Sequence, residues 1–144
     1  MAIKKHGSAV WKGTLKEGTG AVSTETGVLS DQPYGFKTRF EGETGTNPEE
    51  LIGAAHASCF AMALSMILGD HDLEAAEIRA ISTVSLEKDD AGFSITRVHL
   101  DVSAKVPGAD DTAFQTAAEA AKKGCPVSKV LAGAEITMTA RLDS

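Results

Sequence analysis

The segment TNPEELIGAAHASCFAMALSMILG, residues Thr46 to Gly69, predicts one long helix that organises the rest of the fold. Thr46 or Asn47 can serve as its N-cap, and Pro48 suits the first helical position. The two glutamates that follow Pro48 complement the positive end of the helix. Gly69 is the expected stop, because glycine is common just beyond the last helical turn.

From Leu51 to Leu68 this helix is apolar nearly all the way round, as is typical of a helix enclosed on all sides. The stretch barely reaches the roughly 20 residues that a membrane span needs and contains polar residues, so we expect a central core helix. Gly53, Ala57 and Ala61 recur every four positions and form a ridge without bulk. Such a ridge lets another backbone approach closely, and we expect the same helix of a second subunit there.

The segments on either side predict short strands and helices. A hairpin is expected over residues 6–26, and the piece Phe36–Phe40 alternates like a strand, with Arg39 opposite the two phenylalanines. The remaining pattern predicts a strand over 76–88, a strand over 93–106 with a bulge near Thr96 or Arg97, a helix over 107–124, a short helix over 125–133 and a strand over 134–142. This order predicts an α+β fold with an antiparallel sheet, in a single domain over residues 1–144.

Charge and targeting signals limit the classes of partner. The 144 residues include 14 basic and 20 acidic ones, for a net charge of −6. This sign repels nucleic-acid phosphates and anionic membranes, so we expect neither as a partner. No apolar run of signal-peptide length follows the N-terminal lysines, and we therefore expect a cytoplasmic protein.

The two cysteines, Cys59 and Cys125, do not form the disulfide framework of a small secreted domain, and in a reducing cytoplasm we expect them to pair only transiently. Cys59 is either a buried packing residue or a reactive thiol, with His56 one helical turn earlier as a possible proton acceptor. Because Cys59 lies well inside its helix, an activated thiol there needs a cation from elsewhere.

Cys125 has the more favourable local setting. It follows Gly124 and precedes Pro126, at the cap of the expected short helix, where free backbone amides favour a thiolate. Local physics alone thus ranks Cys125 above Cys59 as the nucleophile, although a helix stop and restart explains the same residues. A zinc site from His56, Cys59 and Cys125 has three suitable ligand types but lacks paired-ligand spacing.

Three separated motifs resemble the OsmC/Ohr family of peroxide-reducing proteins: QPYGFKTRFEG at 32–42, TNPEELIGAAHASCFAMALS at 46–65 and GCPVSKVL at 124–131. The likeness covers nearly the whole chain. It implies a thiol-dependent peroxidase that acts on organic hydroperoxides without a metal or prosthetic group, built as an intertwined homodimer with its sites between subunits. It also implies that an outside dithiol resets the enzyme, and suggests a lipoyl-bearing protein as that reductant.

The resemblance assigns a role to four residues. Cys59 matches the cysteine that attacks peroxide, Cys125 the resolving cysteine, Arg39 the activating arginine and Glu49 the glutamate that holds it. This reverses the ranking that local physics gives the two cysteines, and it gives His56 no role in catalysis. Glu49 and Cys59 lie ten residues apart, about 15 Å along one straight helix. We therefore expect Arg39 and Glu49 from one subunit to meet Cys59 and Cys125 of the other.

A rival interpretation from another class is a binding protein. In that case an apolar groove of the dimer holds small hydrophobic ligands, and the two cysteines are incidental.

Overall fold

The computed structural model describes residues 1–143, which fold into two compact units. Unit 1 is Met1–Leu51, and unit 2 starts at Ile52. The expectation that residues 1–144 form a single domain stays a prediction.

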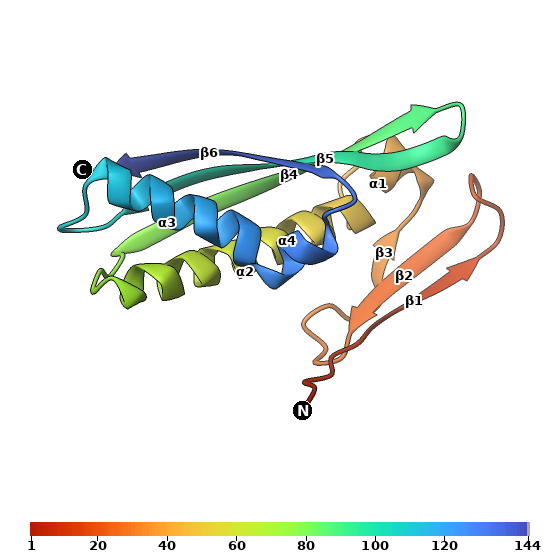
Figure 1. Cartoon of the computed structure of the whole chain (residues 1–144). Helices are drawn as coiled ribbons and strands as arrows, with labels where there is room; N and C mark the ends of the chain where they lie inside the picture. The colour runs from red at the N-terminus through yellow and green to blue at the C-terminus, as the bar shows by residue number, and fades with distance from the viewer. Residues whose placement is uncertain (144) are drawn as a thin grey trace. The chain divides into compact units, whose positions relative to one another are not determined.

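Unit 1 is a three-stranded antiparallel sheet of β1 (Gly7–Lys12), β2 (Thr19–Thr24) and β3 (Gln32–Tyr34), which lie side by side in chain order (Figure 1). The predicted N-terminal hairpin is confirmed. The rings of Trp11 and Tyr34 pack 5.6 Å apart, and a Cβ at Gly20 would lie only 2.6 Å from the Tyr34 ring. Glycine at this position therefore lets the two rings meet across β2.

The predicted extended piece at Phe36–Phe40 is wrong, because these residues form the short helix α1 (Phe36–Phe40). Thr38 explains the difference. Its hydroxyl oxygen accepts a hydrogen bond from the Gly35 N–H at 2.9 Å, and its O–H donates to the Gly35 carbonyl at 3.0 Å, so the side chain fixes a helical turn. The rings of Phe36 and Phe40 then pack together one turn apart, at 4.9 Å.

The predicted long helix is confirmed as α2 (Pro48–Asp70). Asn47 is its cap, since the Asn47 side-chain oxygen accepts a hydrogen bond from the Glu50 N–H at 2.7 Å. By length and composition α2 could cross a membrane, but its residues Phe60, Leu64 and Leu68 belong to the core of unit 2. One side of α2 thus packs in the core of unit 2, and its central place in the fold stays a prediction.

The expectation that α2 is enclosed on all sides is not met within one chain. The buried residues of α2 occupy one side of the helix, whereas Met62 is 77% and Met66 65% exposed on another. The close approach of a backbone to Gly53 is confirmed, but the neighbour is the carbonyl oxygen of Ser82 in the same chain, 2.7 Å from the position that a Cβ would take.

Unit 2 contains a second sheet, of β4 (Glu77–Asp89), β5 (Gly92–Lys105) and β6 (Glu135–Asp143), in that order. β4 and β5 pair antiparallel, and the predicted bulge is confirmed, because Thr96 has no partner where the register shifts between Ser85 and Leu86. The prediction of an antiparallel sheet is wrong for β6, which pairs parallel to β5. The helices between β5 and β6 carry the chain back to the end from which β5 starts, which makes the pair parallel.

Those helices are α3 (Asp111–Gly124) and α4 (Pro126–Val130), and both were predicted. The Asp110 carboxylate accepts a hydrogen bond from the Ala113 N–H at 2.8 Å and caps α3. Helices α2, α3 and α4 cover one face of the β4–β5–β6 sheet (Figure 1). The core of unit 2 lies between them, with buried residues from α2, β5 and α3: Phe60, Leu64, Leu68, Leu100, Val102, Ala104, Phe114, Ala117, Ala118 and Ala121.

Candidate functional site

The structure brings Cys59 and Cys125 together. Their Sγ atoms lie 2.8 Å apart, within hydrogen-bond distance, and both thiols are free. Cys59 comes from the middle of α2 and is partly exposed, whereas Cys125 lies between α3 and α4 and is fully buried. A disulfide bond is about 2.05 Å long, so only a small movement separates these thiols from a bridge.

Cys125 occupies the predicted cap position of α4, with Pro126 as the first helical residue. Burial raises the pKa of the Cys125 thiol. Hydrogen bonds from Cys59, from the backbone and hydroxyl of Ser128 and from the backbone of Val127 outweigh that effect, so the pKa of Cys125 lies below its ordinary value.

The pKa of the Cys59 thiol shifts in the opposite direction. Burial and the hydrogen bond with Cys125 raise the pKa of Cys59, against a smaller opposing effect from the Val127 backbone. Of the two thiols, Cys59 is therefore the harder to ionise. Within unit 2 the thiolate is favoured at Cys125, as local physics suggested from the sequence alone.

Arg39 and Glu49 form the second pair that the sequence singled out, and both lie in unit 1. Arg39 Nε donates to Glu49 Oε1 at 3.1 Å, and Arg39 Nη2 donates to Glu49 Oε2 at 3.0 Å. The guanidinium of Arg39 also lies 5.4 Å from the centre of the Phe40 ring. Helix α1 and the first turn of α2 thus hold the planar group by a two-point carboxylate contact, a geometry that lysine cannot reproduce.

An apolar groove adjoins Arg39. It has a volume of about 260 Å³, and its lining includes Trp11, Leu15, Phe36 and Phe40 together with Arg39. A small organic molecule with one polar end fits such a groove, because the rings offer apolar surface and the guanidinium offers charge.

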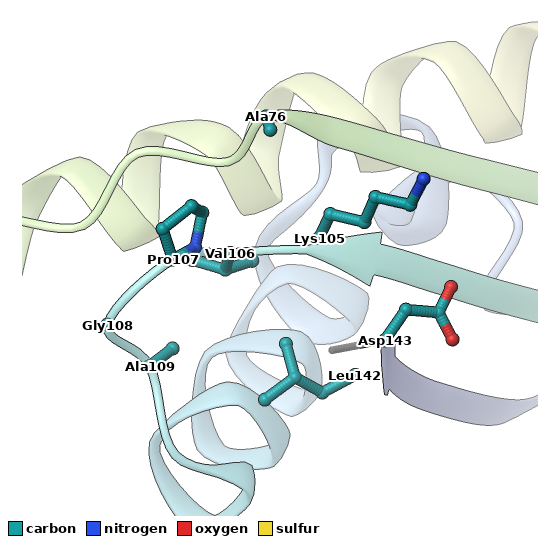
Figure 2. Close-up of a pocket in the computed structure, with 8 residues that line it drawn as sticks. All are labelled: Ala76, Lys105, Val106, Pro107, Gly108, Ala109, Leu142 and Asp143. Atoms are coloured by element: carbon teal, nitrogen blue, oxygen red, sulfur yellow. The ribbon is translucent and has the colours of Figure 1, made fainter.

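A larger cavity, of about 560 Å³, lies elsewhere in unit 2. Figure 2 shows Pro107 and Lys105 on one side of it and Leu142 and Asp143 on another. Its lining also includes Ala109, which precedes α3, whereas Cys125 follows that helix. The lining contains neither cysteine, and the cavity is separate from the candidate site.

His56 does not pair with Cys59, the partner considered from the sequence. Its ring is fully buried, with Nδ1 2.8 Å from the Ser82 Oγ and Nε2 2.8 Å from the Ser128 Oγ. Burial lowers the pKa of His56 below its ordinary value. Since both ring nitrogens bond to hydroxyls, the zinc alternative is not favoured, and the described residues include no group of three His, Cys, Asp or Glu that could hold a metal.

Sequence reasoning missed Ser82 and Ser128. A signal for Ser82 existed, because it lies on the inward side of β4 between Ala80 and Val84, where a polar side chain needs a partner. Ser128 gave no comparable signal, since α4 is too short for an apolar stripe to define its inner face.

Comparison with known proteins shows that the chain is similar to OsmC-like proteins, among them a peroxiredoxin and an organic hydroperoxide resistance protein. The sequence model for "OsmC-like protein" matches residues 40–141. The "Peroxiredoxin OsmC" of Escherichia coli (strain K12) is 56% identical over 144 residues, 100% of both chains. The "Organic hydroperoxide resistance protein OhrB" of Bacillus subtilis (strain 168) is 34% identical over 115 residues, 79% of this chain and 82% of its own length.

Solved structures share the fold. The crystal structure of OhrB from Bacillus subtilis superposes with a TM-score of 0.68 at 27% identity, covering 96% of this chain and 98% of its own. The OsmC-like protein from Mycoplasma pneumoniae reaches a TM-score of 0.77 with full coverage of both chains at 15% identity, which concerns the fold alone.

Proposed function

The chain belongs to the OsmC-like family, and from this premise we propose that it is a thiol-dependent peroxidase that reduces organic hydroperoxides to alcohols. The names of its relatives, a peroxiredoxin and an organic hydroperoxide resistance protein, support a peroxidase role. The observation that carries the proposal is the pair of free thiols at 2.8 Å, one partly exposed and one buried.

The proposed reaction starts at Cys59. Its thiolate attacks one oxygen of the O–O bond, which leaves a sulfenic acid on Cys59 and releases an alkoxide that takes up a proton to become the alcohol. The Cys125 sulfur then displaces hydroxide from the Cys59 sulfur and forms the disulfide, before a second peroxide can oxidise Cys59 further. An external dithiol restores both thiols, and the family resemblance suggests a lipoyl-bearing protein for this step.

We assign to Arg39 the ionisation of Cys59, which the surroundings of Cys59 in unit 2 do not favour. Because the pKa of Cys59 is raised there, a fixed positive charge is needed to favour its thiolate. In the proposed enzyme Arg39, held by Glu49, provides that charge and also stabilises the departing alkoxide. The apolar groove beside Arg39 suits the organic part of the hydroperoxide.

We further propose that the working form is a homodimer in which Arg39 and Glu49 of one chain serve Cys59 and Cys125 of the other. The spacing of Glu49 and Cys59 along one helix supports this arrangement. A mixed dimer of Arg39→Ala and Cys59→Ser chains keeps one intact set of residues, so it should regain about half of the activity. No recovery in verified mixed dimers would refute the shared site.

Intact mass after one equivalent of cumene hydroperoxide tests the reaction directly. The unaltered chain should lose two mass units as the disulfide forms, and Cys125→Ser should gain one oxygen, trapped as sulfenic acid at Cys59. Cys59→Ser should remain unmodified. A protein that only binds hydrophobic ligands would consume no hydroperoxide, and that result would reject the enzyme.

A further inference from the structure

One surface of the groove beside Arg39 is built across the sheet of unit 1. Trp11 on β1, Gly20 on β2 and Tyr34 on β3 are direct cross-strand partners, so these positions lie on one face of the sheet. Gly20 puts no side chain between the two rings, whose centres are 5.6 Å apart. The indole and the phenol ring thus form one apolar surface, and both residues line the groove.

The indole of Trp11 is held in a fixed position. A Cβ at Gly20 would lie 2.7 Å from the indole Cε3 atom, and a Cβ at Gly18 would lie 2.9 Å from its Cζ2 atom. The ring therefore fills the space that two side chains would otherwise take. The indole N–H donates a hydrogen bond to the Gly13 carbonyl oxygen at 3.0 Å. Because Trp11 is also 36% exposed, a ligand can contact a surface that is already ordered.

Helix α1 supplies a second aromatic surface to the same groove. The rings of Phe36 and Phe40 pack 4.9 Å apart, and both residues belong to the lining. Aromatic groups gain from contact with such rings beyond the burial of apolar area. A groove of about 260 Å³ with aromatic rings from a sheet and from a helix therefore suits a compact organic group, such as a phenyl ring.

Arg39 provides the polar end of the groove. Its contact with Glu49 uses Nε and Nη2. The N–H groups of Nη1 are outside this contact and can donate to an oxygen of a ligand. The groove thus orients a molecule that has an apolar group at one end and oxygen atoms at the other.

We propose that Trp11 is a specificity-determining residue, whose fixed indole binds the organic group of the hydroperoxide while Arg39 receives its oxygen atoms. The substrate class that it selects is a hydroperoxide with an aryl or branched alkyl group on the carbon that carries the peroxide. This inference rests on the proposed peroxidase function for the reaction, whereas binding of an apolar group against the indole does not depend on that function. Hydrogen peroxide has no organic group and gains nothing from Trp11.

The first experiment measures binding without any reaction. Trp11 is the single tryptophan of the chain, so tryptophan emission comes from this residue of the groove alone. In Cys59→Ser protein, 2-phenyl-2-propanol, the alcohol formed from cumene hydroperoxide, should change the emission in a saturable way. Methanol at equal concentrations controls for the effect of an alcohol as solvent and should give no saturation. A titration with 2-phenyl-2-propanol that follows the methanol titration would overturn the proposal.

The second experiment measures the rate of Cys59 oxidation by two peroxides in single turnovers. Trp11→Ala should lower the rate constant for cumene hydroperoxide about tenfold, as expected for the loss of about 60 Å² of apolar contact. The rate constant for hydrogen peroxide should stay within about twofold of the parent. Trp11→Phe keeps an aromatic ring and should restore part of the rate. An equal loss with both peroxides would indicate a structural defect and refute the role in specificity.

Two further variants separate a change of the groove from a loss of the fold. Gly20→Ala keeps both rings but places a methyl group 2.6 Å from the Tyr34 ring, so the rings must move. It should slow oxidation by cumene hydroperoxide more than oxidation by hydrogen peroxide. Val10→Ala is the matched control, because Val10 lies on the opposite face of β1 and is 56% exposed. A selective loss in Val10→Ala, or none in Gly20→Ala and Trp11→Ala, would contradict the proposal.

The two experiments separate the two proposals. If 2-phenyl-2-propanol binds at Trp11 but no peroxide oxidises Cys59, the binding role of Trp11 is confirmed and the peroxidase fails. If cumene hydroperoxide oxidises Cys59 at a rate that Trp11→Ala does not change, the peroxidase stands and the role of Trp11 is rejected.

Discussion

Unit 1 holds Arg39 and Glu49 of the candidate site, and unit 2 holds its two cysteines. The two units differ in how far they bury these residues. No residue of Met1–Leu51 is buried, and the side chain of Arg39 is 36% exposed. In unit 2 Cys125 and His56 are fully buried against an apolar core. The Arg39 guanidinium thus stays near water and avoids the full cost of burying a charge. Cys125 and His56, in contrast, are removed from water.

In the proposed enzyme this difference explains why neither pair of residues suffices alone. Unit 2 brings the sulfurs together but raises the pKa of Cys59. Unit 1 fixes a guanidinium in a defined plane and keeps it accessible. In the proposed dimer the accessible Arg39 of one chain, held by Glu49, serves the cysteines of the other chain.

The largest expected effect tests where the stability resides. Phe60→Ala removes a fully buried ring from the core of unit 2 and should lower the free energy of unfolding by about 3–5 kcal/mol. Val10→Ala in β1, where the side chain is 56% exposed, should cost about 0.5 kcal/mol or less. Denaturant unfolding followed by circular dichroism measures both, and equal losses would contradict the contrast.

The next effect tests the charged half. Arg39→Ala should slow single-turnover oxidation of Cys59 at least about 100-fold, since both thiolate formation and stabilisation of the leaving oxygen are lost. Arg79→Ala is the matched control, because Arg79 makes the same two-point contact with Glu77, at 3.0 and 3.3 Å. Its rate should stay within about twofold of the parent. An oxidation rate of Arg39→Ala within about twofold of the parent would contradict the proposed role of Arg39 in activating Cys59.

A smaller effect tests how closely α2 approaches β4. Gly53→Ala places a methyl group 2.7 Å from the Ser82 carbonyl oxygen, so one of the two backbones must shift, at a cost of about 2 kcal/mol. Gly69→Ala near the end of the same helix has no atom within 4 Å of the new methyl and should be neutral or slightly stabilising. Thermal unfolding of the pair of variants gives the comparison, and a harmless Gly53→Ala would show that the contact is loose.

The smallest effect is a pH dependence specific to unit 2. The pKa of His56 is lower in the folded protein than the ordinary histidine value of about 6.5, so below that pH the unfolded chain binds a proton that the folded chain resists. Stability should therefore fall as pH drops below about 6.5, by at most about 1.4 kcal/mol per pH unit, and be constant with respect to this group above it. Unfolding of His56→Gln across the same pH range should lack this contribution, and an unchanged slope would contradict it.

Local patterns were enough to predict much of unit 2. The Asp110 cap, the apolar stripe of α3 and the phase change near Thr96 are visible over a few residues, because each depends on near neighbours in the chain. α1 was missed since five residues with alternating phenylalanines fit a strand equally well, and the Thr38 hydroxyl decides the outcome.

Long-range partners were harder to predict. The parallel pairing of β6 depends on a crossover through two helices, which alternation within β6 does not reveal. The roles of Cys59, Cys125, Arg39 and Glu49 came from the motif resemblance, and these roles stay predictions. The link from His56 to Ser82 and Ser128, 26 and 72 positions away, exists only once three elements are packed.

The unequal burial of the two sulfurs also sets the order of events when an oxidised chain is reduced. An incoming thiolate can reach Cys59, which is partly exposed, but not the enclosed Cys125. Attack at Cys59 expels Cys125, the better leaving group, because the lower pKa belongs to Cys125. In the proposed enzyme, access and leaving-group acidity thus favour one mixed disulfide, in which the reductant is joined to Cys59, the sulfur proposed to react with peroxide.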